Sequence, residues 1–432
     1  MGFSYRDAND RVMRALPAVV AVLLLFVPVA GTIGPVAGSA SPPAVEAAEP
    51  VRPQTGVSQV DRSNLTFRTL SAPAEADARV GSAARGANLG PALSFAVDDT
   101  AAAVETAAVV DRIESAETNT ERQQLILAAL SRVERDEVSL QSRQSAAFRA
   151  HASGNLSDQE LLDELVRISA TAREYDQRLD TIDALADETP GFSAPSRLDE
   201  LQVALQVYEG PARDVALSTA RGEAAAAEIH VESTERSVTL ATIVDGQYVR
   251  ETFRVDRWDR GGDAISNDAA INVTTASYPE TAALREPDAF GAGAVQRITI
   301  PHEYGSLRTF VSGGTEQVFV EHQRIDLDRF PDTERVSDGG DGFNVTVERS
   351  YAGGPVIVTV RDEETGEPAP GVTVTKSVGD GDSRAIGATN ADGVVTTLSP
   401  ADSYRITVVD EPRVVVIDEL RPVATPRLVD DE

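Results

Sequence analysis

Residues Ser157–Ile182 read SDQELLDELVRISATAREYDQRLDTI, and this stretch carries the strongest structural signal in the chain. Ser157 and Glu160 have the spacing of a capping box, in which each side chain bonds the backbone amide of the other residue. Behind the box, core-forming residues recur at alternating steps of four and three. They are Leu161, Leu165, Ile168, Ala172, Tyr175, Leu179 and Ile182. This spacing predicts a helix with one apolar seam that faces a partner helix.

The sequence before this helix predicts two more. Proline suits the first position of a helix, so we expect one over residues 91–116, and a second over 120–152. The second carries a looser apolar stripe, which Glu137 and Gln144 interrupt. The stripe consists of Ile126, Leu130, Val133, Leu140 and Ala147. A short join at 153–156 would fold the second and third helices into an antiparallel hairpin.

Two shorter helices complete a helical region at 91–225. One carries Leu198, Leu201, Leu205 and Tyr208 and stops at Gly210-Pro211, where the next begins. The apolar seam has two interpretations. It is either a spacer or dimerisation arm, or part of a bundle that buries its own stripes, and we favour the bundle.

After about residue 227 the apolar period changes to two, which is typical of strands. Residues 238–244 and 248–255 flank Asp245-Gly246, a dipeptide that fits a tight hairpin turn. A strand at 228–234 precedes this hairpin. A second set of strands is expected at 296–300, 307–311 and 317–324, and the stretch 263–286 between them is ambiguous and could include a helix. The sequence therefore predicts a small antiparallel α+β unit over 226–332.

Asp338–Gly342 marks the next predicted boundary. Short strands rich in valine and threonine follow at regular spacing, which predicts a β-sandwich over 341–420. They are expected at 343–350, 356–361, 372–377, 385–388, 394–397, 404–409 and 413–417. An acidic tail at 421–432 ends the chain.

Three segments of the sandwich resemble a prealbumin-like domain, of the carboxypeptidase regulatory-like type. These are VTVRDEETGEPAPGV at 358–372, GATNADG at 387–393 and YRITV at 404–408. Gly366, Pro368 and Gly371 would set the bend between two strands. The resemblance implies an accessory module that binds or spaces and supplies no catalysis.

A looser resemblance covers most of residues 90–330. It rests on GPARD at 210–214, IHVES at 229–233, the hairpin at 240–255 and IPHEYGSL at 300–307. Together these segments are similar to an uncharacterised exported protein family of haloarchaea. This resemblance implies no known active residues.

The N-terminal segment predicts export. Arg6, Arg11 and Arg14 precede the apolar run ALPAVVAVLLLFVPV at 15–29, and small residues follow at 38–40. This is the layout of a secretory signal, so we predict a signal peptide over 1–40, with an uncleaved anchor at 15–37 as the alternative. Residues 41–90 read as a linker rich in proline, alanine and glycine, except for a short strand candidate at Leu65–Leu70 that would join a later sheet.

The composition indicates a halophile. The chain has 69 acidic residues, 39 basic residues and a formal net charge of -30. Only Lys376 is a lysine. Such charge destabilises a compact state in dilute salt and is largely screened in molar salt. It argues against nucleic acid as a partner, and against membrane contact except through the N-terminal segment. There is no cysteine, which excludes thiol catalysis and cysteine-ligated metals.

No catalytic, cofactor-binding or metal-binding residues are predicted. The four histidines, His151, His230, His302 and His322, match no catalytic or metal motif. A metal site of His302 and His322 with Glu303 and Glu321 is one interpretation, and we favour the other, isolated histidines in a sheet. Serine hydrolysis would need a serine, a histidine and an acid brought together by folding.

Two kinds of modification are candidates. Sequons place N-glycosylation at Asn64, Asn155, Asn272 and Asn344. Lys376 could form an isopeptide bond with Asn390 or Asp410, as in some prealbumin-like surface modules. The alternative is a lysine at the end of an exposed strand.

We thus expect a multidomain α+β protein: a signal or anchor, a helical hairpin or bundle, a small antiparallel unit and a prealbumin-like β-sandwich. The predicted function is a non-enzymatic, cell-surface or secreted protein of a halophile that acts as an interaction or spacer module. Its expected partners are envelope or extracellular proteins, or a second copy bound through the helical region. The alternative is a secreted hydrolase or its accessory subunit, with the sandwich as auxiliary domain.

Overall fold

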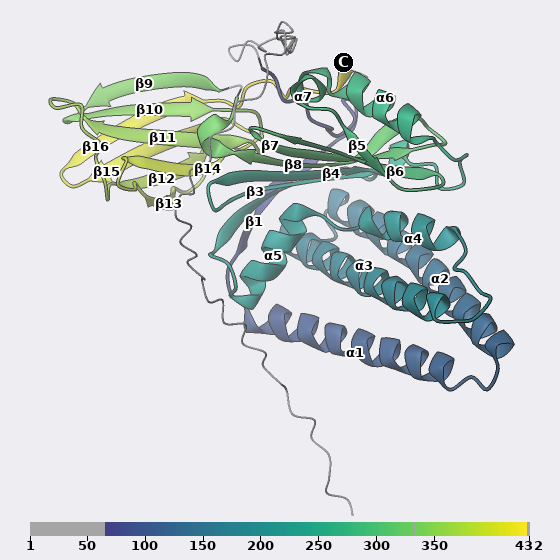
Figure 1. The fold of residues 1–432 in the computed structure, drawn as a ribbon. Coiled ribbons are helices and arrows are strands. Elements are labelled where there is room, and N and C mark those ends of the chain that lie inside the picture. The colour runs from purple at the N-terminus through teal and green to yellow at the C-terminus, as the bar shows by residue number, and fades with distance from the viewer. Residues whose placement is uncertain (1–64, 332, 430–432) are drawn as a thin grey trace, which may run out of the picture. The chain divides into compact units, whose positions relative to one another are not determined.

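The computed structural model describes residues 65–331 and 333–429. The predicted signal or anchor and residues 41–64 of the predicted linker, Asn64 among them, lie outside the described residues. Within them the chain is α+β, as predicted, and has seven α-helices and three antiparallel sheets. Five helices lie between the first and second strands of an eight-stranded sheet, two more lie between its fourth and fifth strands, and a β-sandwich follows (Figure 1).

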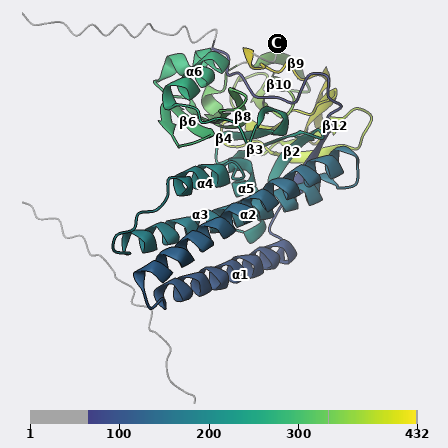
Figure 2. The same cartoon turned by 90° about the vertical axis from the view of Figure 1, so that its right-hand side faces the viewer.

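The first five helices form a bundle in which α1–α4 run side by side (Figure 2). They are α1 (Leu89–Glu114), α2 (Asn119–Ala152), α3 (Asp158–Asp187), α4 (Arg197–Gln206) and α5 (Pro211–Arg221). The predicted capping box is present, because Ser157 and Glu160 bond each other's backbone amides. Every residue of the predicted seam is buried except Tyr175, which is half-buried. Because α1, α2 and α4 pack on α3 within the same chain, the bundle interpretation accounts for the seam.

The central sheet has the strand order β1-β2-β3-β4-β8-β7-β6-β5. Its strands are β1 (Arg79–Arg85), β2 (Ala227–Ser233), β3 (Ser237–Val244), β4 (Gln247–Arg254), β5 (Asp288–Phe290), β6 (Val295–His302), β7 (Gly305–Ser312) and β8 (Gln317–Asp326). The bundle packs on one face, where it shares a hydrophobic core with Phe253, Phe310 and Phe319. Helices α6 (Asn267–Ser277) and α7 (Pro279–Leu284) cover the other face with a separate core (Figure 1).

The C-terminal part is a β-sandwich of two four-stranded sheets, with strand orders β14-β11-β10-β9 and β13-β12-β15-β16. Its strands are β9 (Glu334–Gly340), β10 (Phe343–Arg349), β11 (Pro355–Asp362), β12 (Thr373–Val378), β13 (Arg384–Ala388), β14 (Val394–Leu398), β15 (Tyr404–Asp410) and β16 (Arg413–Leu420). Alternate residues of these strands point between the two sheets and form a buried core made mostly of valine and isoleucine.

Three local expectations differ from the structure. Strand β1 lies inside the predicted linker, and its sequence, RVGSAAR, has too little apolar alternation to signal a strand. Leu65–Leu70 lies on the sheet but forms only one bridge, between Thr69 and Arg427. Strand β9 runs through the predicted boundary at Asp338–Gly342, because it pairs along its whole length with β10. The turn between them has Asp341 and Gly342 at positive φ.

Candidate functional site

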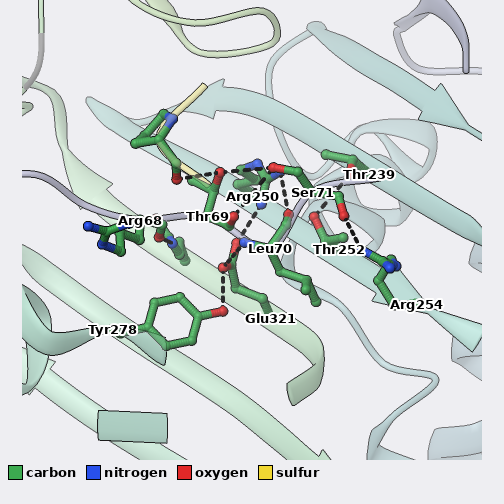
Figure 3. Close-up of polar contacts among 12 residues, drawn as sticks. Arg68, Thr69, Leu70, Ser71, Thr239, Arg250, Thr252, Arg254, Tyr278 and Glu321 are labelled. Atoms are coloured by element: carbon green, nitrogen blue, oxygen red, sulfur yellow. Dashed lines mark hydrogen bonds and ion pairs between the residues drawn. The ribbon is translucent and has the colours of Figure 1, made fainter. Parts of the chain in front are cut away.

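A completely buried carboxylate lies at the centre of the sheet. Glu321 of β8 is 0% exposed, and its two oxygens accept three hydrogen bonds (Figure 3). Arg250 Nη1 donates at 2.5 Å, the Leu70 amide at 2.6 Å and the Tyr278 hydroxyl at 2.6 Å. Arg250 Nη2 also donates to the Leu70 carbonyl at 2.8 Å. We call Leu70, Arg250, Tyr278 and Glu321 the clamp.

The clamp lies where both ends of the described chain meet. The Thr69 amide donates to the Pro426 carbonyl at 2.7 Å, and Arg427 Nη1 donates to the Ala72 carbonyl at 2.9 Å. Arg254 Nη1 donates to the Ser71 carbonyl at 2.7 Å (Figure 3). Charged side chains of β4 and β8 thereby fix the first described segment on the sheet, with the last segment beside it.

The electrostatics of the clamp suit a structural role. Burial raises the pKa of Tyr278 well above its usual range, so the hydroxyl keeps its proton and remains a donor to Glu321. Burial opposes the charge on Arg250, but the Glu321 carboxylate, with smaller contributions from Tyr248, Tyr351 and Glu232, raises the pKa of the guanidinium overall. The clamp side chains are at most 4% exposed, so a substrate cannot reach them.

A second buried network lies on the opposite face, one residue along β4. Glu251 accepts from the Ala212 amide at 2.9 Å and from Arg213 Nε at 2.7 Å. Helix α5 has no side-chain cap of its own at Gly210, so Glu251 serves as its N-terminal cap from a neighbouring strand. Successive strand residues point to opposite faces, which explains how Arg250 and Glu251 serve two different layers.

The two residues that interrupt the predicted stripe of α2 belong to this network. Gln144 Oε1 accepts from Arg213 Nη1 at 3.1 Å. Glu137 Oε1 accepts from the Tyr208 hydroxyl at 2.8 Å, and Glu137 also forms an ion pair with Arg260. The sequence showed the interruptions, but partners so far along the chain could be found only from the fold.

Folding also brings a serine, a histidine and an aspartate together, which sequence patterns had not located. His151 Nδ1 lies 2.6 Å from Ser233 Oγ, and His151 Nε2 lies 2.8 Å from Asp158 Oδ1. A serine hydrolase needs its serine at the substrate surface. Here Ser233 and His151 are both 0% exposed, and only Asp158 reaches solvent. These contacts therefore hold the α2–α3 turn against the end of β2. They do not present a solvent-exposed serine nucleophile.

The structure separates His302 from His322. Arg308 of β7 faces His322 on one side and Thr299 on the other, so His322 shares a sheet face with Thr299. His302, three residues after Thr299, points to the other face, where it stacks near Phe67. Burial lowers the pKa of His302 to about 4. Among the residues the structure describes, no group of three or more histidines, aspartates or glutamates could hold a metal ion.

Lys376 is buried where the sandwich meets the central sheet. Its Nζ donates to Glu228 of β2 at 3.3 Å, to Thr397 Oγ1 at 2.9 Å and to the Leu398 carbonyl at 2.9 Å. Burial lowers the pKa of Lys376, and the Glu228 carboxylate opposes that shift. Lys376, Glu228 and Leu398 line a pocket of about 180 Å³ together with His230.

The partners proposed for an isopeptide bond make other contacts. The Asn390 side chain accepts from the backbone amides of Asp392 and Val394, and Asp410 pairs with Arg413. The isopeptide bond stays a prediction. An intact mass lower than the sequence mass by about 17 or 18 Da, the loss of ammonia or water, would establish it.

The three described sequons are exposed. Asn155 lies at the α2–α3 turn, Asn272 on α6 and Asn344 on β10. Their glycosylation stays a prediction. No helix in the described part of the chain combines the length and apolarity needed to cross a membrane.

Comparison with known proteins divides the chain into three matched segments. Residues 12–225 match a domain of unknown function (DUF7096), and residues 229–331 match a family of unknown function (DUF7094). Residues 334–417 match an archaeal fibronectin-III type-like domain. No curated protein and no solved structure matches the chain. The chain is therefore similar to two families of unknown function and, in its C-terminal part, to an archaeal domain that fits the β-sandwich observed here.

Proposed function

We propose that this protein is a non-enzymatic, exported cell-surface protein of a halophile that acts as a rigid spacer. The observation that carries the proposal is the junction between the sandwich and the central sheet. Tyr351 and Leu398 of the sandwich share a hydrophobic cluster with Tyr248 and Ala241 of the sheet. The rings of Tyr248 and Tyr351 lie 6.4 Å apart.

A partly buried ion pair adds to this apolar junction, because the buried Lys376 of β12 pairs with Glu228 of β2, which is 34% exposed. Domains move relative to one another by default unless their interface is large and hydrophobic. A junction with both apolar packing and an ion pair to a buried lysine favours a fixed geometry. The clamp supports the same function, since it fixes to the sheet the segment that follows the predicted N-terminal anchor.

The rigidity can be tested by measuring a distance across the junction. Because the chain has no cysteine, spin labels can be placed at Glu117→Cys in the α1–α2 turn and Asp380→Cys in the β12–β13 turn, both exposed. Pulsed electron spin resonance in molar salt is expected to give one narrow distance distribution. Tyr351→Ala should broaden it, whereas the exposed control Arg384→Ala should not. A broad or two-peaked distribution in the unperturbed pair contradicts a rigid spacer.

Export and habitat need a separate test. Protease treatment of intact cells should degrade the native protein while a cytosolic marker survives. N-terminal sequencing should begin after Ala40, or at residue 1 if residues 15–37 anchor the chain. Recovery from the cytosol with residues 1–40 intact contradicts export. The finer prealbumin-like assignment of the sandwich and glycosylation at the sequons stay part of this proposal.

Any self-association is proposed to use α1. Leu89, Leu93, Val97 and Val104 lie on this helix and are 56–73% exposed. Residues 89–97 contain no charged side chain, so two copies can bring this stretch together without opposing carboxylates. Sedimentation in molar salt should show a dimer that Leu93→Gln with Val97→Gln weakens. A monomer at all concentrations contradicts the proposal.

A further inference from the structure

A pocket on the bundle-facing side of the sheet is lined on one wall by basic residues. The pocket has a volume of about 160 Å³ and lies between the start of α5 and strands β6–β8. Arg308 of β7 and Arg324 of β8 line it together with His322, and we call it the arginine pocket. Arg308 pairs with His322 across the two strands, and Ser306 pairs with Arg324. The two arginines are therefore close neighbours on the same face.

Neither arginine has an ion-pair partner within the described parts of the chain. The pocket is lined by two carboxylates as well, yet neither of them forms an ion pair with these two arginines. They are Glu209 and Asp214, and both are paired with Arg173 on the helical side. Like charges on adjacent strands repel one another. Burial raises the pKa of Glu209, and the charges of Arg173 and Arg308 oppose that shift, so Glu209 offsets part of the positive charge without forming an ion pair with either arginine of the pocket.

The buried side chain of His322 lies beside the same positive charges. Burial lowers the pKa of His322 well below its usual range, and the charges of Arg308, Arg213 and Arg324 lower it further, against a hydrogen bond with the Glu209 backbone. His322 is thus a neutral ring beside two guanidinium groups. Thr299 and Ser306 also line the pocket and bring hydroxyl donors.

We propose that the arginine pocket binds an oxyanion, meaning the carboxylate or the sulfate or phosphate group of a ligand. Guanidinium groups present paired N–H donors that match two oxygens of such a group. A volume of about 160 Å³ admits the charged group and little more, so the rest of the ligand lies outside. The protein's overall negative charge repels anions, and the pocket selects them locally.

The test uses the full-length protein and two simple probes, sodium acetate and sodium sulfate. Each is titrated by calorimetry at constant ionic strength in molar potassium chloride. Saturable binding of either probe is expected, and Arg308→Gln and Arg324→Gln should weaken it at least about tenfold, since each loses a charge-assisted contact. The matched control, Arg112→Gln, removes an exposed arginine on α1 and should bind normally.

A second measurement distinguishes binding from a general salt effect. The chain has four histidines, so the ring signals are assignable by NMR, and His322→Asn identifies its own. Saturating probe should raise the pKa of His322 and leave that of His302 unchanged. Preference for acetate identifies a carboxylate ligand, and preference for sulfate identifies a sulfate or phosphate ligand.

The proposal is overturned if neither probe saturates, or if Arg308→Gln and Arg324→Gln bind as well as the parent protein. Circular dichroism shows whether each variant folds. If a glutamine variant does not fold, Arg324→Lys replaces it in the titration. This substitution keeps the positive charge but loses the paired N–H donors, so it should still weaken binding of the probe.

Discussion

Arg250 and Glu251 are neighbours in β4, yet each pairs with a charge on a different face of the sheet. The partners lie far along the chain, because Glu321 is 71 residues from Arg250 and Arg213 is 38 residues from Glu251. Strand alternation alone places their side chains on opposite faces. It does not identify their partners, which depend on β4 lying between β3 and β8.

Glu321→Gln should destabilise the protein by about 3–5 kcal/mol, because it leaves the buried Arg250 charge without compensation. Denaturant unfolding in molar salt measures the loss. Glu334→Gln is the control. Glu334 forms an ion pair with Arg349, but its carboxylate is 63% exposed, so this substitution should cost less than about 1 kcal/mol. A loss for Glu321→Gln as small as that of this control would show that the clamp contributes little.

Asp176 on α3 predicts a pH dependence. Burial, and then the charge of Asp180, raise the pKa of Asp176 to about 6 from an ordinary 3.8. Its Oδ1 is buried and accepts no hydrogen bond from the described residues. Because the folded pKa lies above the unfolded one, the ionised group destabilises the fold above pH 6, and protonation relieves this as the pH falls towards 4.

Asp176→Asn is therefore expected to be more stable than the parent protein at pH 7.5, by about 1 kcal/mol for a side chain still partly exposed. The difference should vanish near pH 4. Melting temperatures measured across this range test it, with Asp382→Asn, an exposed loop residue, as the control. A difference that does not change with pH would assign the effect to something other than ionisation.

At the scale of elements, local signals located the helices and hairpins well. The capping box at Ser157, the seam behind it and the Asp245-Gly246 turn all act between residues close in sequence, and each is present. Strands β1, β5 and β9 escaped prediction, since their pairing with β2, β6 and β10 provides what their own sequences lack. The same limit applied to the candidate sites. Sequence located Lys376 as unusual, but the arginine pocket and the Ser233–His151–Asp158 chain needed the register of the strands.

Ser233→Ala and His151→Asn test whether that chain is structural. Each should cost about 1–3 kcal/mol, because each leaves a buried polar partner unsatisfied. Hydrogen exchange should increase at the α2–α3 turn and at the end of β2, and not in the sandwich. Asn155→Ala, an exposed change in the same turn, is the control. A fluorophosphonate should not label Ser233, and labelling that Ser233→Ala abolishes would contradict the structural assignment.

At the scale of the whole molecule, the buried and exposed charges act in opposite ways. The clamp and the Glu251–Arg213 pair that caps α5 are buried, so ions in solution screen them little. The formal net charge of -30 is different, because most of it lies on exposed acids whose repulsion extends over a screening length. That length falls from about 10 Å at 0.1 M salt to about 3 Å at 1 M. Salt should therefore stabilise this fold through its surface and leave its buried pairs intact.

The melting temperature should accordingly rise steeply between 0.1 M and 1 M potassium chloride and then level off. Each kcal/mol of relieved repulsion corresponds to about 2 °C for a chain of this size. Screening depends on ionic strength alone, so sodium and potassium chloride should act equally, whereas an uncharged osmolyte at matched water activity should not reproduce the early rise. Glu321→Gln should lose the same free energy at both salt concentrations. If the parent protein melts at the same temperature in dilute buffer and in molar salt, its acidic surface does not oppose folding, and composition no longer favours a halophilic habitat.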